Sequence, residues 1–259
     1  MNGPVAPGWT GLAWASIPPA LALILLARGR LGQVGPMAVA MARLVVQLWL
    51  LGLVLGAIFA TNSPWVVLAT TFAMLAVAAH TVGARQASSR WQIRLESLVA
   101  MGVGIAITMA IGVRLALRLE PWYAPSTFIP LFGMILGNSV TGVSLAAERL
   151  ASDLKADRDL VEQRLALGAT SRQAATPALR AAVRASLTPI INNMSIVGIV
   201  AIPGMTAGQL LAGADVLSAV RYQVLIYLGI AATATFSTLI LLSLRLRRHF
   251  TAAHQLREP

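Results

Sequence analysis

Residues 148–189, ERLASDLKADRDLVEQRLALGATSRQAATPALRAAVRASLTP, form the only long polar passage in this chain. Five apolar runs precede the passage and two follow it. The chain has 259 residues, of which 57% are hydrophobic and 11% charged, a composition far from that of a soluble domain. The sequence therefore predicts an all-helical, polytopic membrane protein, with this passage as a helical cytoplasmic loop between the fifth and sixth spans.

The first half of the passage has the pattern of one short helix over residues 157–167. Leu160, Val161 and Leu165 recur at helical spacing, and acidic residues stand near the start. Gly168 follows where a left-handed C-cap closes many helices. We therefore expect a short helix that ends at this glycine.

The residues after Gly168 predict a tight turn and a second helix. Thr170 stands three residues before Gln173, which is the spacing of a capping box. Thr176 followed by Pro177 offers another N-cap, with proline at the first helical position. A loop that only joins two spans does not need so many capping signals. We therefore expect this region to dock on a cytoplasmic partner.

Seven apolar runs are predicted to cross the bilayer, which requires roughly 20 residues per helix. Pro18 and Pro19 should kink the first span, and residues 30–43 could form an interfacial helix before the second. The sixth run is short, so its helix either begins at or before Pro189 or breaks at Pro203. The seven runs are 9–27, 44–60, 64–80, 97–115, 126–147, 190–202 and 222–244.

The basic residues indicate an orientation with the N-terminus outside and the C-terminus in the cytoplasm of a bacterial cell, in its inner membrane. Residues 28–43, 81–96, 148–189 and the C-terminal tail then hold 17 of the 20 lysines and arginines on the cytoplasmic side. The net charge of +11 follows from this topology, so nucleic acid is not an expected partner.

Polar residues inside the predicted spans are amides and hydroxyls, and no Asp or Glu lies in the middle of a span. Met134 and Asn138 share a helix face at i, i+4 spacing, and a second polar group opens the sixth run. These residues either line a substrate path, with Glu148 at its cytoplasmic mouth, or bond and pack between helices. The candidate path residues are Met134, Asn138, Glu148, Asn192, Asn193 and Met194.

Small residues at four-residue spacing in the fifth span, Gly133, Gly137 and Thr141, predict a close approach of another helix. That helix could belong to the same chain or to a second copy.

Two blocks carry a family resemblance. Residues 162–168, EQRLALG, are similar to the coupling loop of ABC permeases, which docks on the ATPase. The longer match runs from MILGNSVTGVSLAAERL at 134–150 through residue 223, and the resemblance extends upstream through RLVVQLWLLGLVLGAIF at 43–59, so it covers most of the chain. These residues resemble the FetB/YbbM family of bacterial iron-export permeases, which includes plant aluminium-tolerance permeases. The residues that follow Gly168 differ from those of importers.

The resemblance implies one permease domain over residues 1–259, which exports iron or another metal ion. The chain contains no GxxxxGK[ST] phosphate loop, so ATP and Mg²⁺ would be bound and hydrolysed by a separate ABC ATPase subunit, and this chain would be neither an enzyme nor a cofactor protein. A homodimer of permeases with two ATPases is implied. The implied coupling residues are Glu162, Leu165, Gly168, Thr170 and Arg172.

Other functions stay open from the residues alone. An ABC permease for a polar organic solute would fit the amides in the spans equally well. A secondary transporter or channel without an ATPase is disfavoured, because such proteins usually keep acidic relays within the membrane. An enzyme is disfavoured because His80, His249 and His254 are scattered along the sequence.

Overall fold

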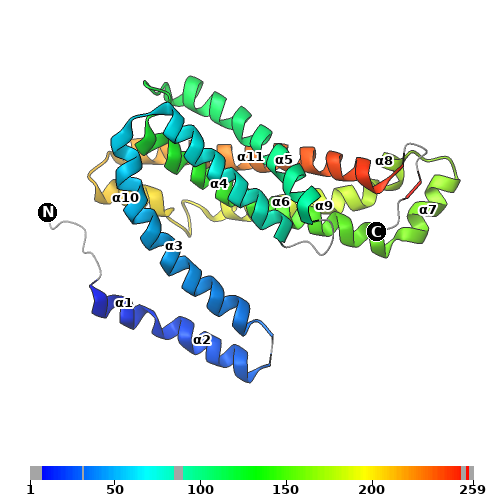
Figure 1. Ribbon diagram of the computed structural model, residues 1–259, viewed down its shortest axis with the longest axis horizontal. Coiled ribbons are helices and arrows are strands. Elements are labelled where there is room, and N and C mark those ends of the chain that lie inside the picture. The colour runs from blue at the N-terminus through cyan, green and yellow to red at the C-terminus, as the bar shows by residue number, and fades with distance from the viewer. Residues whose placement is uncertain (1–7, 31, 85–89, 252–254, 257–259) are drawn as a thin grey trace. The chain divides into compact units, whose positions relative to one another are not determined.

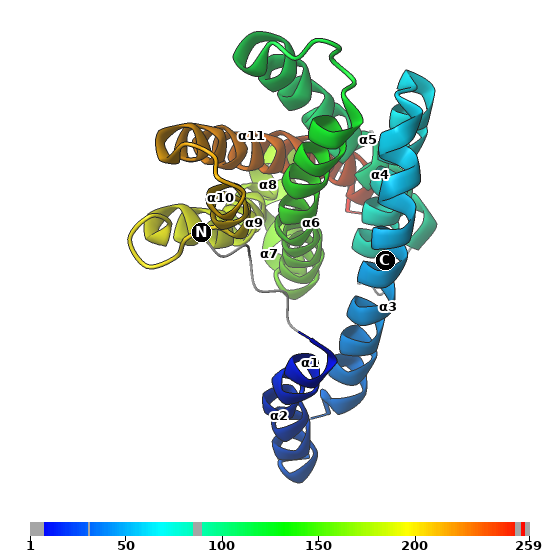
Figure 2. The same ribbon diagram turned by 90° about the vertical axis from the view of Figure 1, so that its left-hand side faces the viewer.

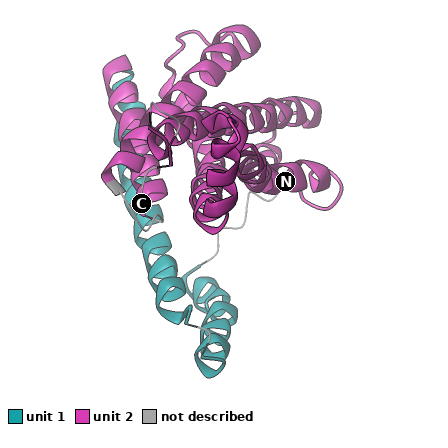
Figure 3. Ribbon diagram, turned by 90° about the vertical axis from the view of Figure 1, so that its right-hand side faces the viewer, with its two compact units in different colours: residues 1–62 teal, residues 63–259 magenta. Residues whose placement is uncertain are grey.

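The computed structural model describes residues 8–30, 32–84, 90–251 and 255–256, and every named element in these ranges is helical. Six helical stretches in them are long and apolar enough to cross a membrane, so the all-helical, multi-pass fold is confirmed. Arg85, His254 and Arg257 lie outside the described residues. The chain divides into two compact units, Met1–Asn62 and Ser63–Pro259 (Figure 3).

Unit 1 contains α1 (Trp9–Ala15), α2 (Ile17–Arg28) and α3 (Val34–Thr61). The predicted break of the first span is confirmed at Ser16, because Pro18 and Pro19 are tolerated only in the first turn of a new helix. The prediction of a separate interfacial helix over residues 30–43 was wrong. No breaking signal interrupts α3, which is one helix of 28 residues. None of the described residues of these three helices is buried, so their apolar side chains depend on the surrounding membrane for burial.

Unit 2 contains α4 (Pro64–Ala84), α5 (Arg90–Ile111), the π-helix η1 (Gly112–Leu117), α6 (Pro125–Ala156), α7 (Arg158–Ala166), α8 (Ser171–Ala174), α9 (Thr176–Ile196), α10 (Gly204–Leu211) and α11 (Val216–His249). Helix α11 packs against α5, α6 and α9, while α4 packs against α5 and α6. Figure 1 shows α7 and α8 at one end of this bundle and α10 at the other. Helices α6, α9 and α11 position the residues of the candidate site.

Helix α9, which lies between α6 and α11 along the chain, also runs through the bundle, in addition to the six candidate spans. Leu154 near the end of α6 and Phe250 just after α11 lie in one hydrophobic cluster, so both helices run toward the same end. The chain between them has to return, and α9 does so beside α6 (Figures 1 and 2). The apolar run 190–202 marks only part of this helix. The predicted start at or before Pro189 is confirmed, and the alternative of a break at Pro203 is not, because the helix already ends at Ile196. The helix begins at Thr176 and includes two arginines in its first half, which lower its hydropathy and hid its true start.

The end of α9 is set by its backbone. The helix stops at Ile196, and Gly198, with φ of +80°, turns the chain toward Pro203, the N-cap residue directly before α10. Asp215 then caps α11, because its carboxylate accepts a hydrogen bond from the Ser218 N–H at 2.9 Å. This bond lowers the pKa of the Asp215 carboxyl.

Small and hydroxylated residues join the helices of unit 2. The hydroxyl oxygens of Ser186 in α9 and Thr238 in α11 are 2.6 Å apart, and Thr233 in α11 donates to Thr108 in α5 at 2.9 Å. Both pairs are buried, so each hydroxyl satisfies the other in a part of the bundle that water does not reach.

The close helix approach in α6 occurs at Gly142. A Cβ added there would be 2.8 Å from the main-chain oxygen of Ser186 in α9, so only glycine fits without a shift. Of the residues predicted for this role, Gly133 faces only the flexible end of Met74, Gly137 has nothing within 4 Å, and Thr141 is exposed. The helix that approaches belongs to the same chain.

A buried charge cluster ties the start of α5 to the end of α11. Because α5 begins at Arg90, Glu96 lies inside a helix and is only 5% exposed. Its carboxylate is 3.6 Å from the guanidinium of Arg245, which is also buried, and forms a second ion pair with the half-exposed Arg248. His249 completes the cluster with a contact to Arg245 at 3.4 Å.

Candidate coupling surface and substrate path

The turn between α7 and α8 is built by local capping. Gly168 has φ of +87°, and its N–H donates to the Leu165 carbonyl at 2.9 Å, so the predicted C-cap is confirmed. The capping box is confirmed as well. The Thr170 N–H donates to the Gln173 side chain at 2.9 Å, and the Gln173 N–H donates back to the Thr170 hydroxyl at 3.4 Å. The sequence thus folds this turn by itself.

Thr176 was wrongly predicted as an N-cap. It is the first residue of α9, and its hydroxyl donates to the main-chain oxygen of Arg172 at 2.8 Å instead of accepting from the helix. Helix α8 ends only two residues earlier, so the backbone of α9 is already supported by the preceding turn. Pro177 does lie in the first turn of α9, as expected.

The α7–α8 region shares a hydrophobic core with the transmembrane helices. Val161 of α7 and Ala174 of α8 are buried in one cluster with Leu150 of α6, Ala182 of α9 and Leu242 of α11. Helices α7 and α8 therefore pack against α6, α9 and α11 through one cluster.

The outward surface of this region contains most of the predicted coupling residues. Glu162, Gly168, Thr170 and Arg172 are exposed. The Glu162 carboxylate is paired with Arg158 at 2.8 Å, one turn earlier on α7. These four residues line one protruding end of the bundle, where α7 is seen in Figure 1.

Leu165 was predicted to contact the ATPase, but Leu167 is the exposed leucine of this turn. Leu165 packs into the hydrophobic cluster and supports α7 from within. Leu167, which sequence reasoning missed, is 88% exposed at the turn. Its position directly before the C-cap glycine was the available signal, because a side chain there leaves the helix at its end. Its side chain is therefore available for contact with a partner.

The candidate path residues meet in part. Asn138 of α6 and Asn193 of α9 line one cavity of about 170 Å³ between α6, α9 and α11. Thr141 and Tyr227 line it too, and sequence reasoning did not connect them to a path. The side-chain NH₂ of Asn138 donates to the main-chain carbonyl of Met134 at 2.7 Å. The side-chain oxygen of Asn138 is then available to the cavity.

The other four candidates do not line this cavity. Asn192 is exposed beside it, and Met134 and Met194 are half-buried elsewhere on α6 and α9. Glu148 is exposed on α6, seven residues after Thr141, which places both on one face of the helix, about 10 Å apart along its axis. Glu148 therefore lies between the cavity and the coupling end.

A protein family matches almost the whole length of this chain. The family described as "Uncharacterised protein family (UPF0014)" matches residues 9–250. The chain belongs to the UPF0014 family. No solved structure matches the chain.

Relatives of this UPF0014 chain include bacterial and plant proteins. The UPF0014 membrane protein slr1647 of Synechocystis is 38% identical over 96% of both chains. The probable iron export permease protein FetB of Escherichia coli is 31% identical over 83% of this chain and 81% of its own length. The protein ALUMINUM SENSITIVE 3 of Arabidopsis thaliana is 34% identical over 91% of this chain and 85% of its own length. The predicted resemblance is confirmed.

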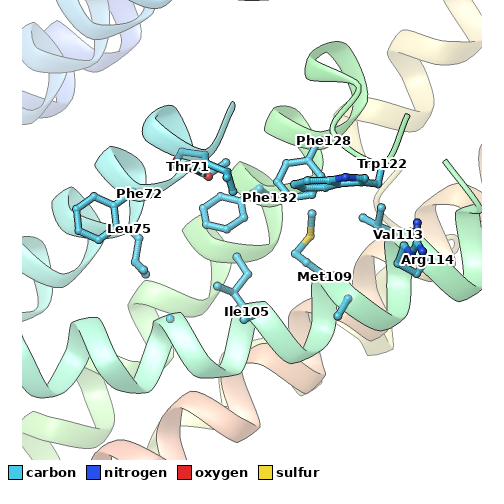
Figure 4. A pocket seen from close by; sticks show the side chains of 14 residues that line it. Thr71, Phe72, Leu75, Ile105, Met109, Val113, Arg114, Trp122, Phe128 and Phe132 are labelled. Atoms are coloured by element: carbon cyan, nitrogen blue, oxygen red, sulfur yellow. Dashed lines mark hydrogen bonds between the residues drawn. The ribbon is translucent and has the colours of Figure 1, made fainter. Parts of the chain in front are cut away.

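A second cavity of this UPF0014 chain, which sequence reasoning missed, lies between α4, α5 and α6 (Figure 4). It encloses about 690 Å³ and is walled by aromatic rings, with Trp122 and Phe128 meeting edge to face at 5.9 Å. Arg114 from the π-helix is its one charged lining residue. Phe128 and Phe132, one turn apart on α6, were the signal in the sequence. The walls suit an apolar or aromatic guest.

The described residues hold no group of three or more His, Cys, Asp or Glu that could bind a metal ion. The polar groups that line the small cavity are the amides of Asn138 and Asn193 and the hydroxyls of Thr141 and Tyr227.

Proposed function

We propose that this chain is the membrane-spanning permease subunit of an ABC transporter that exports iron or another metal ion. A separate ATPase subunit hydrolyses ATP and binds Mg²⁺. The observation that carries the proposal is the capped α7–α8 turn, which presents Leu167 outward while its inner face shares a core with α6, α9 and α11. A partner that moves this turn moves the helices around the small cavity. The choice of iron rests on the similarity to FetB, a probable iron export permease protein.

The assembly we propose is a homodimer of permeases with two ATPases, in which residues 1–259 of each copy act as one permease domain. The chain lies in the bacterial inner membrane, with its N-terminus outside and its C-terminus in the cytoplasm. The distribution of basic residues supports this orientation, since 17 of 20 lie on the α7 side of that topology.

The test of the function is co-expression of the chain with the ATPase encoded in a neighbouring reading frame. We expect iron-loaded cells to accumulate less iron when both subunits are present, and no effect from either alone. Export by this chain without any ATPase would contradict the proposal and favour a secondary transporter or channel.

We expect Asn138→Leu, Asn193→Leu and Glu148→Gln each to reduce iron export. A polar contact to a charged group contributes about 1.5–3 kcal/mol, so each loss should lower transport about tenfold or more. Asn192→Leu is the matched control, because Asn192 is exposed and does not line the cavity. Cellular iron is the readout, with stimulated ATP hydrolysis measured in parallel.

Two outcomes of that series would contradict the path. Export that persists in all three variants would place the path elsewhere. Loss of ATPase assembly together with export would make the amides structural. A polar organic solute is the second candidate substrate, because amides and hydroxyls supply most of the polar lining of the cavity. It would be favoured if stimulated hydrolysis stayed intact without iron export.

The orientation is checked with single cysteines, because the chain has no native cysteine. Ser63→Cys, in the turn between α3 and α4, should react with a membrane-impermeant thiol reagent on intact cells. Ser152→Cys, exposed near the end of α6, should react only after the cells are opened. Labelling of position 152 on intact cells would reverse the topology.

A further inference from the structure

A groove of about 750 Å³ runs between α9 and α11 at the coupling end of the bundle. Helix α8 contributes Arg172 to one end of it. The groove is separate from the small cavity, since no residue lines both.

Four arginines gather at this groove: Arg172, Arg180, Arg184 and Arg247. All four are exposed, and within the described residues none of their guanidinium groups forms an ion pair or a hydrogen bond. The lining contains no acidic residue. Four unpaired cations around one groove repel one another, so the groove favours a ligand with negative charge.

The rest of the lining is mostly apolar. On α9, Arg180 and Arg184 are followed at helical spacing by Leu187 and Ile191, and on α11 Leu239 lies in the same wall as Arg247. From Arg180 to Ile191 the wall extends about 16 Å along the helix axis, close to one leaflet of a hydrocarbon core about 30 Å thick. The charges are therefore at the membrane surface end and the aliphatic side chains reach toward the bilayer centre.

We propose that this groove binds an anionic phospholipid from the leaflet on the α7 side of the membrane. The headgroup phosphate accepts hydrogen bonds from the guanidinium groups, and an acyl chain lies along the aliphatic wall. A free phosphate ion would use only the arginines. A second copy of the chain in a symmetric pair would bring four arginines against four others.

This site would connect membrane composition to coupling. Arg172 belongs to α8, and the same helix carries Ala174 in the core shared with α7. A bound headgroup therefore stabilises the position of α8 relative to α9 and α11. The inference does not depend on which substrate is transported.

The experiment is native mass spectrometry of the full-length chain in detergent with added phosphatidylglycerol or phosphatidylcholine. We expect wild type to retain phosphatidylglycerol, and Arg180→Gln with Arg184→Gln to weaken this retention about tenfold or more. The matched control is Arg28→Gln with Arg43→Gln, two exposed arginines of unit 1 that are not among the residues lining this groove, and this variant should bind as wild type does.

Two further variants separate the possible occupants. Ile191→Thr with Leu239→Thr should weaken retention of the lipid, while added inorganic phosphate should not displace it. Equal retention of both lipids, or wild-type retention by the Arg180 and Arg184 variant, would overturn the proposal. Ser243→Cys lies in the groove and should stay monomeric under oxidation. A disulfide-linked dimer would show that a second copy covers the groove and would also overturn it.

Discussion

Leu167→Ala is expected to remove most of the ATP hydrolysis that the permease stimulates in its partner, while the chain still inserts and folds. The side chain is 88% exposed on the turn between α7 and α8, so its removal leaves the core of unit 2 unchanged. Burial of a leucine side chain in a partner contributes about 2 kcal/mol, which corresponds to about 30-fold in affinity. The measurement is hydrolysis by the reconstituted complex as a function of ATPase concentration.

The matched control is Ile199→Ala. Ile199 is 86% exposed in the segment after α9, at the opposite end of that helix from the coupling turn. The same kind of truncation there should leave stimulated hydrolysis unchanged. Equal effects of the two substitutions would mean that Leu167 has no special contact with the ATPase.

Gly168→Val and Glu162→Lys test the same surface in other ways. Valine resists the φ of +87° at Gly168, and the strain of about 1–3 kcal/mol should move Leu167 from its place. Lysine at position 162 breaks the pair with Arg158 and reverses a charge on the exposed face. Wild-type coupling in both variants would rule out a docking role for this turn.

Glu96→Gln is expected to destabilise the protein by about 3–5 kcal/mol, because it leaves a buried guanidinium without its counter-charge. Arg245 is the affected group, since it is only 5% exposed, while Arg248 can turn to solvent. The measurement is the midpoint of thermal unfolding in detergent, which should fall by several degrees or more.

The control for Glu96→Gln is Glu162→Gln, which removes an exposed i, i+4 pair and should change stability by no more than about 0.5 kcal/mol. A double variant, Glu96→Gln with Arg245→Met, should recover part of the loss because it removes the buried charge as well. A midpoint unchanged by Glu96→Gln alone would show that the cluster does not hold α5 to α11.

Local signals explain what could be predicted. The end of α7 and the start of α8 depend on Gly168, Thr170 and Gln173, which lie within six residues of one another, so the sequence specifies them without reference to the rest of the fold. Asn138 and Asn193 were found because amides are scarce in apolar helices. The structure places both at one cavity.

The features that were missed depend on contacts between distant residues. Gly142 differs from Gly137 only in having the backbone of Ser186 against it, which spacing along α6 cannot reveal. Glu96 was assigned to a loop because its partner Arg245 lies in the last helix. The arginine groove needs α9 and α11 side by side, and the start of α9 at Thr176 was hidden by the arginines that line the groove.

The contact of Gly142 with Ser186 can be read as a fulcrum. Main chain meets main chain there, so α6 cannot slide closer to α9, and the easiest remaining motion is a tilt about that point. Leu154 at the coupling end is about 18 Å from the pivot and Asn138 about 6 Å on the other side, at 1.5 Å per residue. A displacement of the coupling end of α6 would therefore move Asn138 by about one third as much and in the opposite direction. The cavity would widen when the coupling ends of α6 and α9 approach each other.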